Sequence, residues 1–331
     1  MNCTACVLVM VPTLPYMKAF AQAPLAFLRT LSPRSLGVLA VLMFAMTIPM
    51  TRLANGGVEQ PQLPPLFVAL GRGVLAALPA ALYLWWRKAP WPERASRPWL
   101  LGVVLGGVLM FPACMGWAVR VVPAWHASVV TGVLPLVTAA LAAWWLGHRP
   151  RAGFWLAGLI GVSLVLLFAV QTAPEGQGHW HVSDVVLLMG MLGASIAYVA
   201  GARAAQHMPS PQVMSWALVW ALPVTLPGAG WAWWADDAGV SVALIAPQAW
   251  WALLYVALCS SWLGFFAWYA ALARDAMRVS QIQLLQPFGA MALSALLLGE
   301  QVSAWAPLCA LGVALMVWTG QRMIQTKAQS A

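Results

Sequence analysis

Two apolar segments carry polar side chains at matching positions, separated by the 152 residues from Ser128 to Ser280. In each segment two polar positions and a proline are spaced so that they share one face of a helix. These residues are Ser128, Thr131 and Pro135 in the first segment and Ser280, Gln283 and Pro287 in the second. Gln286 lies beside the second face and adds a further hydrogen-bond donor and acceptor.

Polar groups inside a bilayer must find partners within the protein or water, so both faces should point into a bundle of helices. Hydrogen bonds between helices, worth ~0.6 kcal/mol on average, are one interpretation. The recurrence of the face in both segments favours a second one, a cavity that binds a polar solute. The prolines remove backbone hydrogen bonds, which suits a hinge or a binding site, although proline also occurs in ordinary transmembrane helices.

Other polar and aromatic side chains lie within apolar segments. Weaker candidates for the cavity lining are Tyr198, Ser260, Ser261 and Trp262. Trp117 and Tyr269 occupy equivalent positions of the two halves, each a few residues before a short turn. Such rings could gate opposite ends of one path, or could anchor helix ends at the membrane interface.

Three ionisable residues are candidates for handling charge or protons. Arg72 is the only cation inside a predicted helix interior, where insertion costs ~2.5–3.5 kcal/mol unless the side chain snorkels to the outer surface. We expect Arg72 to clamp two helices, with contact to an anionic substrate group as the second interpretation. His126, whose ring titrates near neutral pH, suits a ligand or proton-handling role or simply a neutral ring bonded to a neighbour. Glu300 lies at the outer end of its helix.

The acidic residues all lie in loops or at helix ends, with Glu175 and Asp184 on the predicted outer side. This pattern provides no carboxylate near the middle of the membrane. If the protein transports a solute, we therefore expect exchange of that solute down its own gradient, or weak coupling of transport to protons through a peripheral group. We do not expect a proton relay through a central carboxylate.

Enzyme and metal chemistry find little support in the motifs. The sequence has no H-E-x-x-H, no G-x-S-x-G and no phosphate-cradling loop. Cys3 and Cys6 form a CxxC pair, but no second pair or nearby histidine completes a zinc site. We expect no metal and no cofactor. An intramembrane enzyme and a non-transporting membrane scaffold or chaperone remain the alternatives.

The elements that must position these residues follow from composition. With 62% hydrophobic and 8% charged residues and a mean hydropathy of +0.80, the chain suits a bilayer and not water. Apolar runs long enough to span ~30 Å of hydrocarbon predict ten helices. These runs are 36–55, 65–86, 99–121, 125–146, 153–171, 184–203, 211–234, 249–272, 278–298 and 304–321.

The basic residues orient this all-α, polytopic arrangement. If the N-terminus is cytoplasmic, the outer loops keep only Arg52 and Arg120, so the positive-inside rule also accounts for the net charge of +9 without nucleic acid. Both termini should then face the cytoplasm of a cell with a bacterial-type inner membrane. Because five helices per half is an odd number, the two five-helix repeats should be inverted.

The expected organisation has five parts. Residues 1–35 form a cytoplasmic arm, 36–171 the first repeat, 172–183 an outer linker, 184–322 the second repeat and 323–331 a cytoplasmic tail. Translation could start at Met1 or at Met17.

The segment from Ala118 to Leu167 carries a family resemblance. This segment resembles EamA-type members of the drug/metabolite transporter superfamily in the runs A-V-R-V-V-P-A-W-H-A-S and V-L-P-L-V-T-A-A-L-A-A-W-W-L-G-H-R-P. The second half repeats the pattern as L-L-Q-P-F-G-A and L-L-L-G-E-Q-V. The resemblance covers roughly 36–322 and implies ten helices, a central cavity and export or exchange of small metabolites. One departure is Gly147-His148, where the family commonly has Gly-Glu; Glu300 keeps the pattern.

These observations predict a secondary transporter working by alternating access. Few charges and many hydroxyl, amide and aromatic groups suit amino acids or other neutral, zwitterionic or aromatic solutes. The expected partners are a small-molecule substrate and the lipid bilayer, with the protein a monomer or a homodimer.

Overall fold

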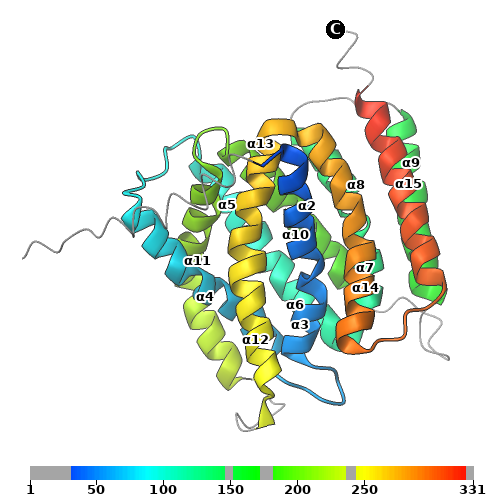
Figure 1. The fold of residues 1–331 in the computed structure, drawn as a ribbon, viewed down its shortest axis with the longest axis horizontal. Coiled ribbons are helices and arrows are strands. Elements are labelled where there is room, and N and C mark those ends of the chain that lie inside the picture. The colour runs from blue at the N-terminus through cyan, green and yellow to red at the C-terminus, as the bar shows by residue number, and fades with distance from the viewer. Residues whose placement is uncertain (1–30, 146–151, 172–181, 236–243, 326–331) are drawn as a thin grey trace, which may run out of the picture.

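A computed structural model describes residues 31–145, 152–171, 182–235 and 244–325 of the chain (Figure 1). These residues are almost entirely helical, apart from short turns and one isolated bridge between Gly56 and Pro61. The predicted arm up to residue 30, the Gly147-His148 pair, nearly all of the linker and the end of the tail lie outside the described residues. The all-helical prediction is confirmed for the described part.

The helices follow one another closely. The first half contains α2 (Pro33–Ala45), α3 (Thr47–Asn55), α4 (Pro65–Trp86), α5 (Arg97–Val103), the π-helical η1 (Val104–Met110), α6 (Phe111–Val121), α7 (Ala124–Thr131), α8 (Leu134–Trp145) and α9 (Ala152–Gln171). The second half contains α10 (Val182–Ala204), α11 (Ser210–Trp234), α12 (Pro247–Tyr255), the π-helical η3 (Val256–Leu263), α13 (Gly264–Ile282), the 3-10 turn η4 (Gln283–Leu285), α14 (Gln286–Leu298) and α15 (Trp305–Gln325).

Seven helical stretches in the described residues are long and apolar enough to cross a membrane. They are Pro33–Asn55, Pro65–Trp86, Arg97–Val121, Ala124–Trp145, Val182–Ala204, Ser210–Trp234 and Pro247–Leu272. Three shorter apolar helices fall on the other predicted spans, at Ala152–Val165, Gln283–Leu298 and Trp305–Thr319. The protein is therefore a multi-pass membrane protein, while the count of ten spans stays a prediction.

The predicted gap between two spans is helical. The eighth predicted span, 249–272, corresponds to the apolar stretch Pro247–Leu272, but no turn separates it from the ninth, because α13 continues to Ile282 and is followed directly by η4. No proline or glycine interrupts the chain between Leu272 and Ile282. The helix therefore continues through the stretch where a break was expected.

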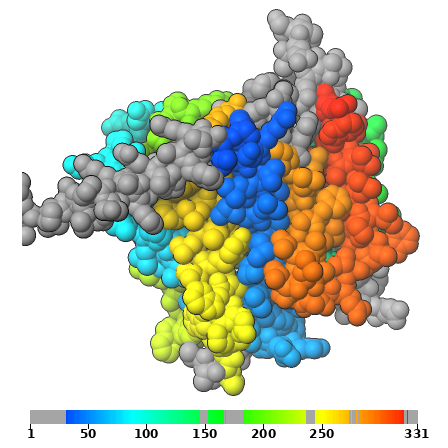
Figure 2. All heavy atoms as spheres, in the orientation of Figure 1, coloured from blue at the N-terminus to red at the C-terminus, as the bar shows by residue number. Residues whose placement is uncertain are grey.

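The two halves pair helix by helix. The most extensive contacts join α4 to α11, α2 to α13 and α9 to α15; α10 packs on α6 and η1, and α14 packs on α7. Figure 1 shows α9 and α15 side by side at one edge of the bundle. In the space-filling view of Figure 2, α12 and α13, then α2 and α3, then α14 and α15, cover the visible face in adjacent bands. Each half thus covers the apolar surface of the other.

Interruptions recur in both halves at the depth of the bundle interior. The π-helical segments begin at Val104 and Val256, which match at the repeat offset. The helix containing α7 and α8 breaks at Gly132 and Val133, just before Pro135, and η4 lies just before Pro287. Proline removes an amide donor, so the chain before it tightens into three-residue hydrogen bonding. The amides of Gly132 and Val133 accordingly donate to the carbonyl oxygens of Val129 and Val130, three residues earlier.

Close helix contacts depend on small residues. A Cβ at Gly201 of α10 would overlap the buried ring of Tyr269 on α13. A Cβ at Gly106 of η1 would overlap the carbonyl oxygen of Gly193 on α10. Glycine at these positions lets α10 approach both neighbours, as small residues commonly do between membrane helices.

Candidate functional site

A cavity lies at the centre of the bundle, between the two halves. It is lined by α2 and α3 (Phe44, Thr47, Ile48), α4 (Arg72), η1 and α6 (Gly107, Phe111), α7 and α8 (Thr131, Leu134), α10 (Ala194, Ala197, Tyr198), η3 and α13 (Ser260, Ser261, Phe265) and α14 (Gln286). Its volume is about 30 Å³, room for one or two water molecules. In the state described, the helices are therefore packed closely around the site.

Arg72 is the one charged residue among those that line this cavity, and it is only 4% exposed. Its Nε donates to Ser261 Oγ at 2.6 Å and its Nη2 to Ser260 Oγ at 3.2 Å. The guanidinium is therefore held inside the bundle and does not reach the outer surface. The contacts tie α4 to η3, and the role of Arg72 as a clamp stays a prediction.

The serines are themselves held in place. Ser261 Oγ donates to the carbonyl oxygen of Val256 at 2.8 Å, which leaves its lone pairs for Arg72. Ser260 Oγ and Thr47 Oγ1 share a hydrogen bond of 2.7 Å. The π-helical segment η3 thus presents both hydroxyls to one guanidinium, and π-helical turns occur often at functional sites.

Aromatic rings form the wall beside this polar group. Phe44 lies 5.1 Å from Phe265 and 6.4 Å from Tyr198, measured between ring centroids. Trp268 packs behind them, 5.5 Å from Tyr198. The cavity therefore combines a cationic, hydroxyl-rich side with an aromatic side.

The predicted polar faces are partly brought to this cavity. Thr131 and Gln286 line it, together with the weaker candidates Tyr198 and Ser260. Ser128 and Thr131 are buried and donate to carbonyl oxygens of their own helix, at Ala124 and Ser128. The two amides are different, because Gln283 Nε2 and Gln286 Oε1 have no hydrogen-bond partner among the described residues although both side chains are buried.

The other predicted positions lie outside the lining. Pro135 and Pro287 are buried at the starts of α8 and α14, where they mark the helix breaks. Trp262 donates from Nε1 to Ser215 Oγ at 2.9 Å. The side chain of Ser280 lies outside the described residues.

The two gate candidates occupy different environments. Trp117 on α6 is 42% exposed, whereas Tyr269 is fully buried and donates to the carbonyl oxygen of Ala197 at 3.1 Å. Equivalent sequence positions therefore do not give equivalent contacts in this state, and the gate role remains a prediction for both.

Glu300 and Arg52 make contacts between the two halves at the predicted outer end of the bundle. Glu300 accepts from the backbone amides of Ala124 at 3.0 Å and Trp125 at 3.1 Å, at the start of α7. Arg52 Nε lies 4.0 Å from Glu300, and its Nη1 donates to the carbonyl oxygens of Val119 and Arg120. A carboxylate at a helix N-terminus satisfies free amides and the positive end of the helix dipole. These contacts join the segment that follows α14 to the start of α7, and α3 to α6.

A buried polar contact between two helices was not predicted from the sequence. Asp184, predicted on the outer side, lies in the first turn of α10 and is only 4% exposed, and its Oδ1 lies 2.7 Å from His126 Nε2. The signal was an acidic residue at the start of an apolar run together with a histidine near the start of another. The pair connects α10 to α7.

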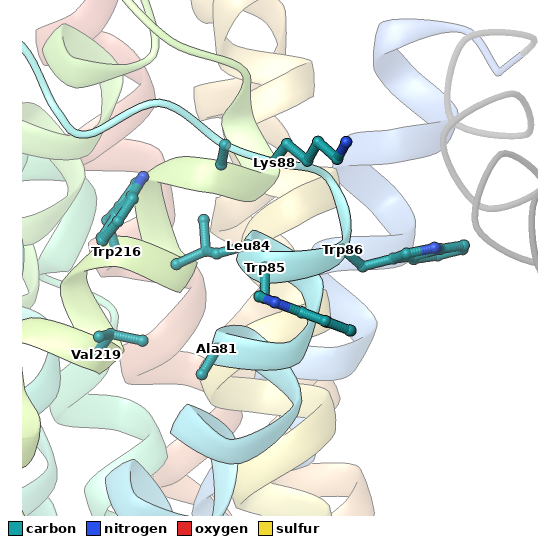
Figure 3. Close-up of a pocket in the computed structure, with 8 residues that line it drawn as sticks. Ala81, Leu84, Trp85, Trp86, Lys88, Trp216 and Val219 are labelled. Atoms are coloured by element: carbon teal, nitrogen blue, oxygen red, sulfur yellow. The ribbon is translucent and has the colours of Figure 1, made fainter. Parts of the chain in front are cut away.

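A larger hollow of about 620 Å³ lies between α4 and α11, away from this chemistry. Its lining is Ala81, Leu84, Trp85, Trp86, Lys88, Ala89, Trp216 and Val219. Figure 3 shows Leu84 facing Trp216 and Val219 across it, while Trp86 points away. It is an open apolar groove near helix ends, so the central cavity is the better candidate site.

Comparison with known proteins supports a transporter. The family model described as EamA-like transporter family matches residues 33–170 and again 181–318. The "Uncharacterized transporter YdeK" of Bacillus subtilis (strain 168) is 34% identical over 85% of this chain and 93% of its own. The "Probable amino-acid metabolite efflux pump" of Salmonella typhimurium (strain LT2) is 31% identical over 73% of this chain and 80% of its own.

A solved crystal structure, described only as that of a protein, covers 90% of this chain and 98% of its own with a TM-score of 0.57 at 15% identity, which shows a shared fold. The double family match confirms the resemblance seen in the sequence, with one match in each half. This chain is a membrane transporter that belongs to the EamA-like transporter family.

Proposed function

We propose that this protein exports or exchanges small metabolites by alternating access, with the central cavity as the binding site. The observation that carries the proposal is that both family-matched halves line one cavity, with Thr47 and Thr131 from the first half and Tyr198, Ser260 and Gln286 from the second. Substrate sites of transporters built from repeats lie at the interface between the repeats. Amino acids and other neutral, zwitterionic or aromatic solutes match the mixed aromatic and polar lining, and one relative is named as an amino-acid metabolite efflux pump.

The proposed topology has ten spans in two inverted five-helix repeats. Support comes from the pairing of α4 with α11, α7 with α14 and α9 with α15, which joins corresponding helices of the two halves. The positive-inside rule orients the bundle with both termini in the cytoplasm of a bacterial-type inner membrane. Cysteine labelling that found the segment Arg87–Arg97 outside would contradict this orientation.

Transport requires the cavity to open, because about 30 Å³ cannot hold a metabolite. On the outer side, the contacts of Glu300 with the start of α7 would have to separate. The helix breaks before Pro135 and Pro287 are the natural places for bending, since backbone hydrogen bonds are already interrupted there. Rocking of one half against the other then exposes the cavity to each side in turn.

Counterflow in proteoliposomes tests the proposal. Vesicles containing the protein are loaded with a mixed panel of unlabelled amino acids and aromatic metabolites, and uptake of labelled members of the panel is followed. We expect transient accumulation that protein-free vesicles lack. Absence of counterflow for every panel member, with correctly folded protein in the vesicles, would overturn the proposal in favour of a non-transporting scaffold.

A further inference from the structure

We infer that Arg72, positioned by Ser260 and Ser261, is a binding subsite for the carboxylate of the transported solute. The inference rests on the proposed function and narrows it to solutes that carry a carboxylate. It starts from a charge imbalance, because the cavity lining contains one buried cation and no acidic residue.

The serines do not balance that charge. Among the described residues, Arg52 lies near Glu300 and His126 contacts Asp184, and neither carboxylate is a partner of Arg72. Two neutral hydroxyl oxygens occupy two of the five N–H donors of the guanidinium. A buried charge without a counterion costs several kcal/mol, so evolution tolerates it chiefly where function needs it. The free donors of Arg72 suit a planar, two-oxygen anion.

The geometry also pre-orients the guanidinium. Ser261 gives its own proton to Val256, and Ser260 is bonded to Thr47, so both serines hold their positions without a ligand. A guanidinium fixed on two sides loses little freedom when it binds an anion. This preorganisation distinguishes a binding group from a cation that merely fills space.

An independent observation points to a ligand at the same cavity. Gln286, on α14, lines the cavity, and its buried Oε1 has no hydrogen-bond partner within the part of the chain that the structure describes. An unpartnered buried acceptor suits an N–H donor such as an ammonium group. With the aromatic rings of Phe44, Tyr198 and Phe265 as the apolar wall, the site matches a zwitterion with an apolar or aromatic side chain.

A matched set of ligands tests the subsite. L-phenylalanine carries both charges, 3-phenylpropanoate keeps only the carboxylate, and L-phenylalaninamide keeps only the ammonium. Binding to the purified protein is measured as the rise in melting temperature with ligand concentration. We expect both carboxylates to bind wild-type protein at least about 30-fold more tightly than the amide, as for loss of one partner of a buried charge pair. Equal protection by the amide, or none by either carboxylate, would overturn the inference.

Substitutions of Arg72 and Ser261 test whether the preference for the acid depends on the guanidinium. Arg72→Gln should abolish the preference for the acid over the amide, Arg72→Lys should keep part of it, and Ser261→Ala should weaken it by loosening the guanidinium. Ser294→Ala is the matched control, because this buried hydroxyl bonds only within α14 and lies outside the cavity lining. An unchanged acid preference in Arg72→Gln would contradict the inference. If Arg72→Gln does not fold, the ligand comparison in wild-type protein and the Ser261→Ala variant still decide.

Further outcomes distinguish the carboxylate subsite from binding of an inorganic anion and from the transport proposal. If sodium chloride alone gives the Arg72-dependent protection and 3-phenylpropanoate adds nothing, the subsite holds an inorganic anion and the inference is overturned. If proteoliposomes exchange the amide as fast as L-phenylalanine, the transport proposal stands and the carboxylate subsite fails. Arg72-dependent binding of the acids without any counterflow would instead support the subsite and refute transport.

Discussion

Glu300→Gln should weaken closure of the outer end of the transporter. The carboxylate accepts from the amides of Ala124 and Trp125, and Gln can replace only one of these acceptors. A hydrogen bond to a charged group is worth about 1.5–3 kcal/mol, and a charge at a helix N-terminus about 0.3–1 kcal/mol. The partly exposed Arg52 contact adds no more than about 1 kcal/mol.

Because Gln retains one of the two bonds, one charged hydrogen bond and the helix-terminus interaction are lost, and the lower ends of their ranges give a destabilisation of the outer-closed state of about 2 kcal/mol. At 1.4 kcal/mol per factor of ten, the outer-open population should rise about 30-fold wherever it is minor. A cysteine at Thr131, in the cavity, reports this opening through its rate of reaction with a membrane-impermeant thiol reagent added outside. The native cysteines are replaced in this background.

Ser294→Ala is the control, because it removes a buried hydroxyl of the neighbouring helix α14 whose hydrogen bond stays within that helix. We expect labelling to accelerate in Glu300→Gln and to stay at the starting rate in the control. An unchanged rate, or acceleration only when the reagent is on the cytoplasmic side, would refute the assignment of Glu300 as an outer closing contact.

Three other outcomes are expected. Gly201→Ala should lower the melting temperature by overpacking, at a cost of about 1–3 kcal/mol, because its Cβ would overlap the buried ring of Tyr269. Gly230→Ala, with open space around it, is the control and should not lower it. Equal melting temperatures of the two variants would refute the close approach of α10 to α13. Thr131→Val and Gln283→Ala should each reduce transport with little change in melting temperature, and normal counterflow in both would remove these residues from the site. An imposed pH gradient should drive at most weak substrate accumulation, and His126→Gln should abolish it, because an amide at this position beside Asp184 cannot carry a proton as an imidazole can. Strong accumulation that survives the substitution would exclude a role for this pair.

Some of the site was open to prediction because its signals are local. Thr131 and Gln286 were found from the helical spacing of polar groups in apolar runs, and both line the cavity. Arg72 was found because a cation in an apolar helix needs an explanation. Its partners were not predicted, since Ser260 and Ser261 lie almost two hundred positions away along the chain and no sequence spacing joins them to α4.

The sequence by itself determined that the chain enters a membrane, approximately where its helices run, and where they break. Hydrocarbon thickness sets the length of each apolar run, and proline interrupts hydrogen bonding within a turn of itself, so these features depend on neighbouring residues only. The repeat of Ser128 and Pro135 as Ser280 and Pro287 likewise needs no coordinates.

Only the tertiary structure decided which polar groups meet. The burial of Asp184 against His126, the seating of Glu300 on α7 and the pairing of Arg72 with η3 each depend on how helices rotate and pack. In lipid the apolar surface of one helix resembles that of another, so hydropathy does not select a helix partner or a rotation. Close packing at residues such as Gly201 and long-range polar contacts make that selection, and these are properties of the assembled bundle.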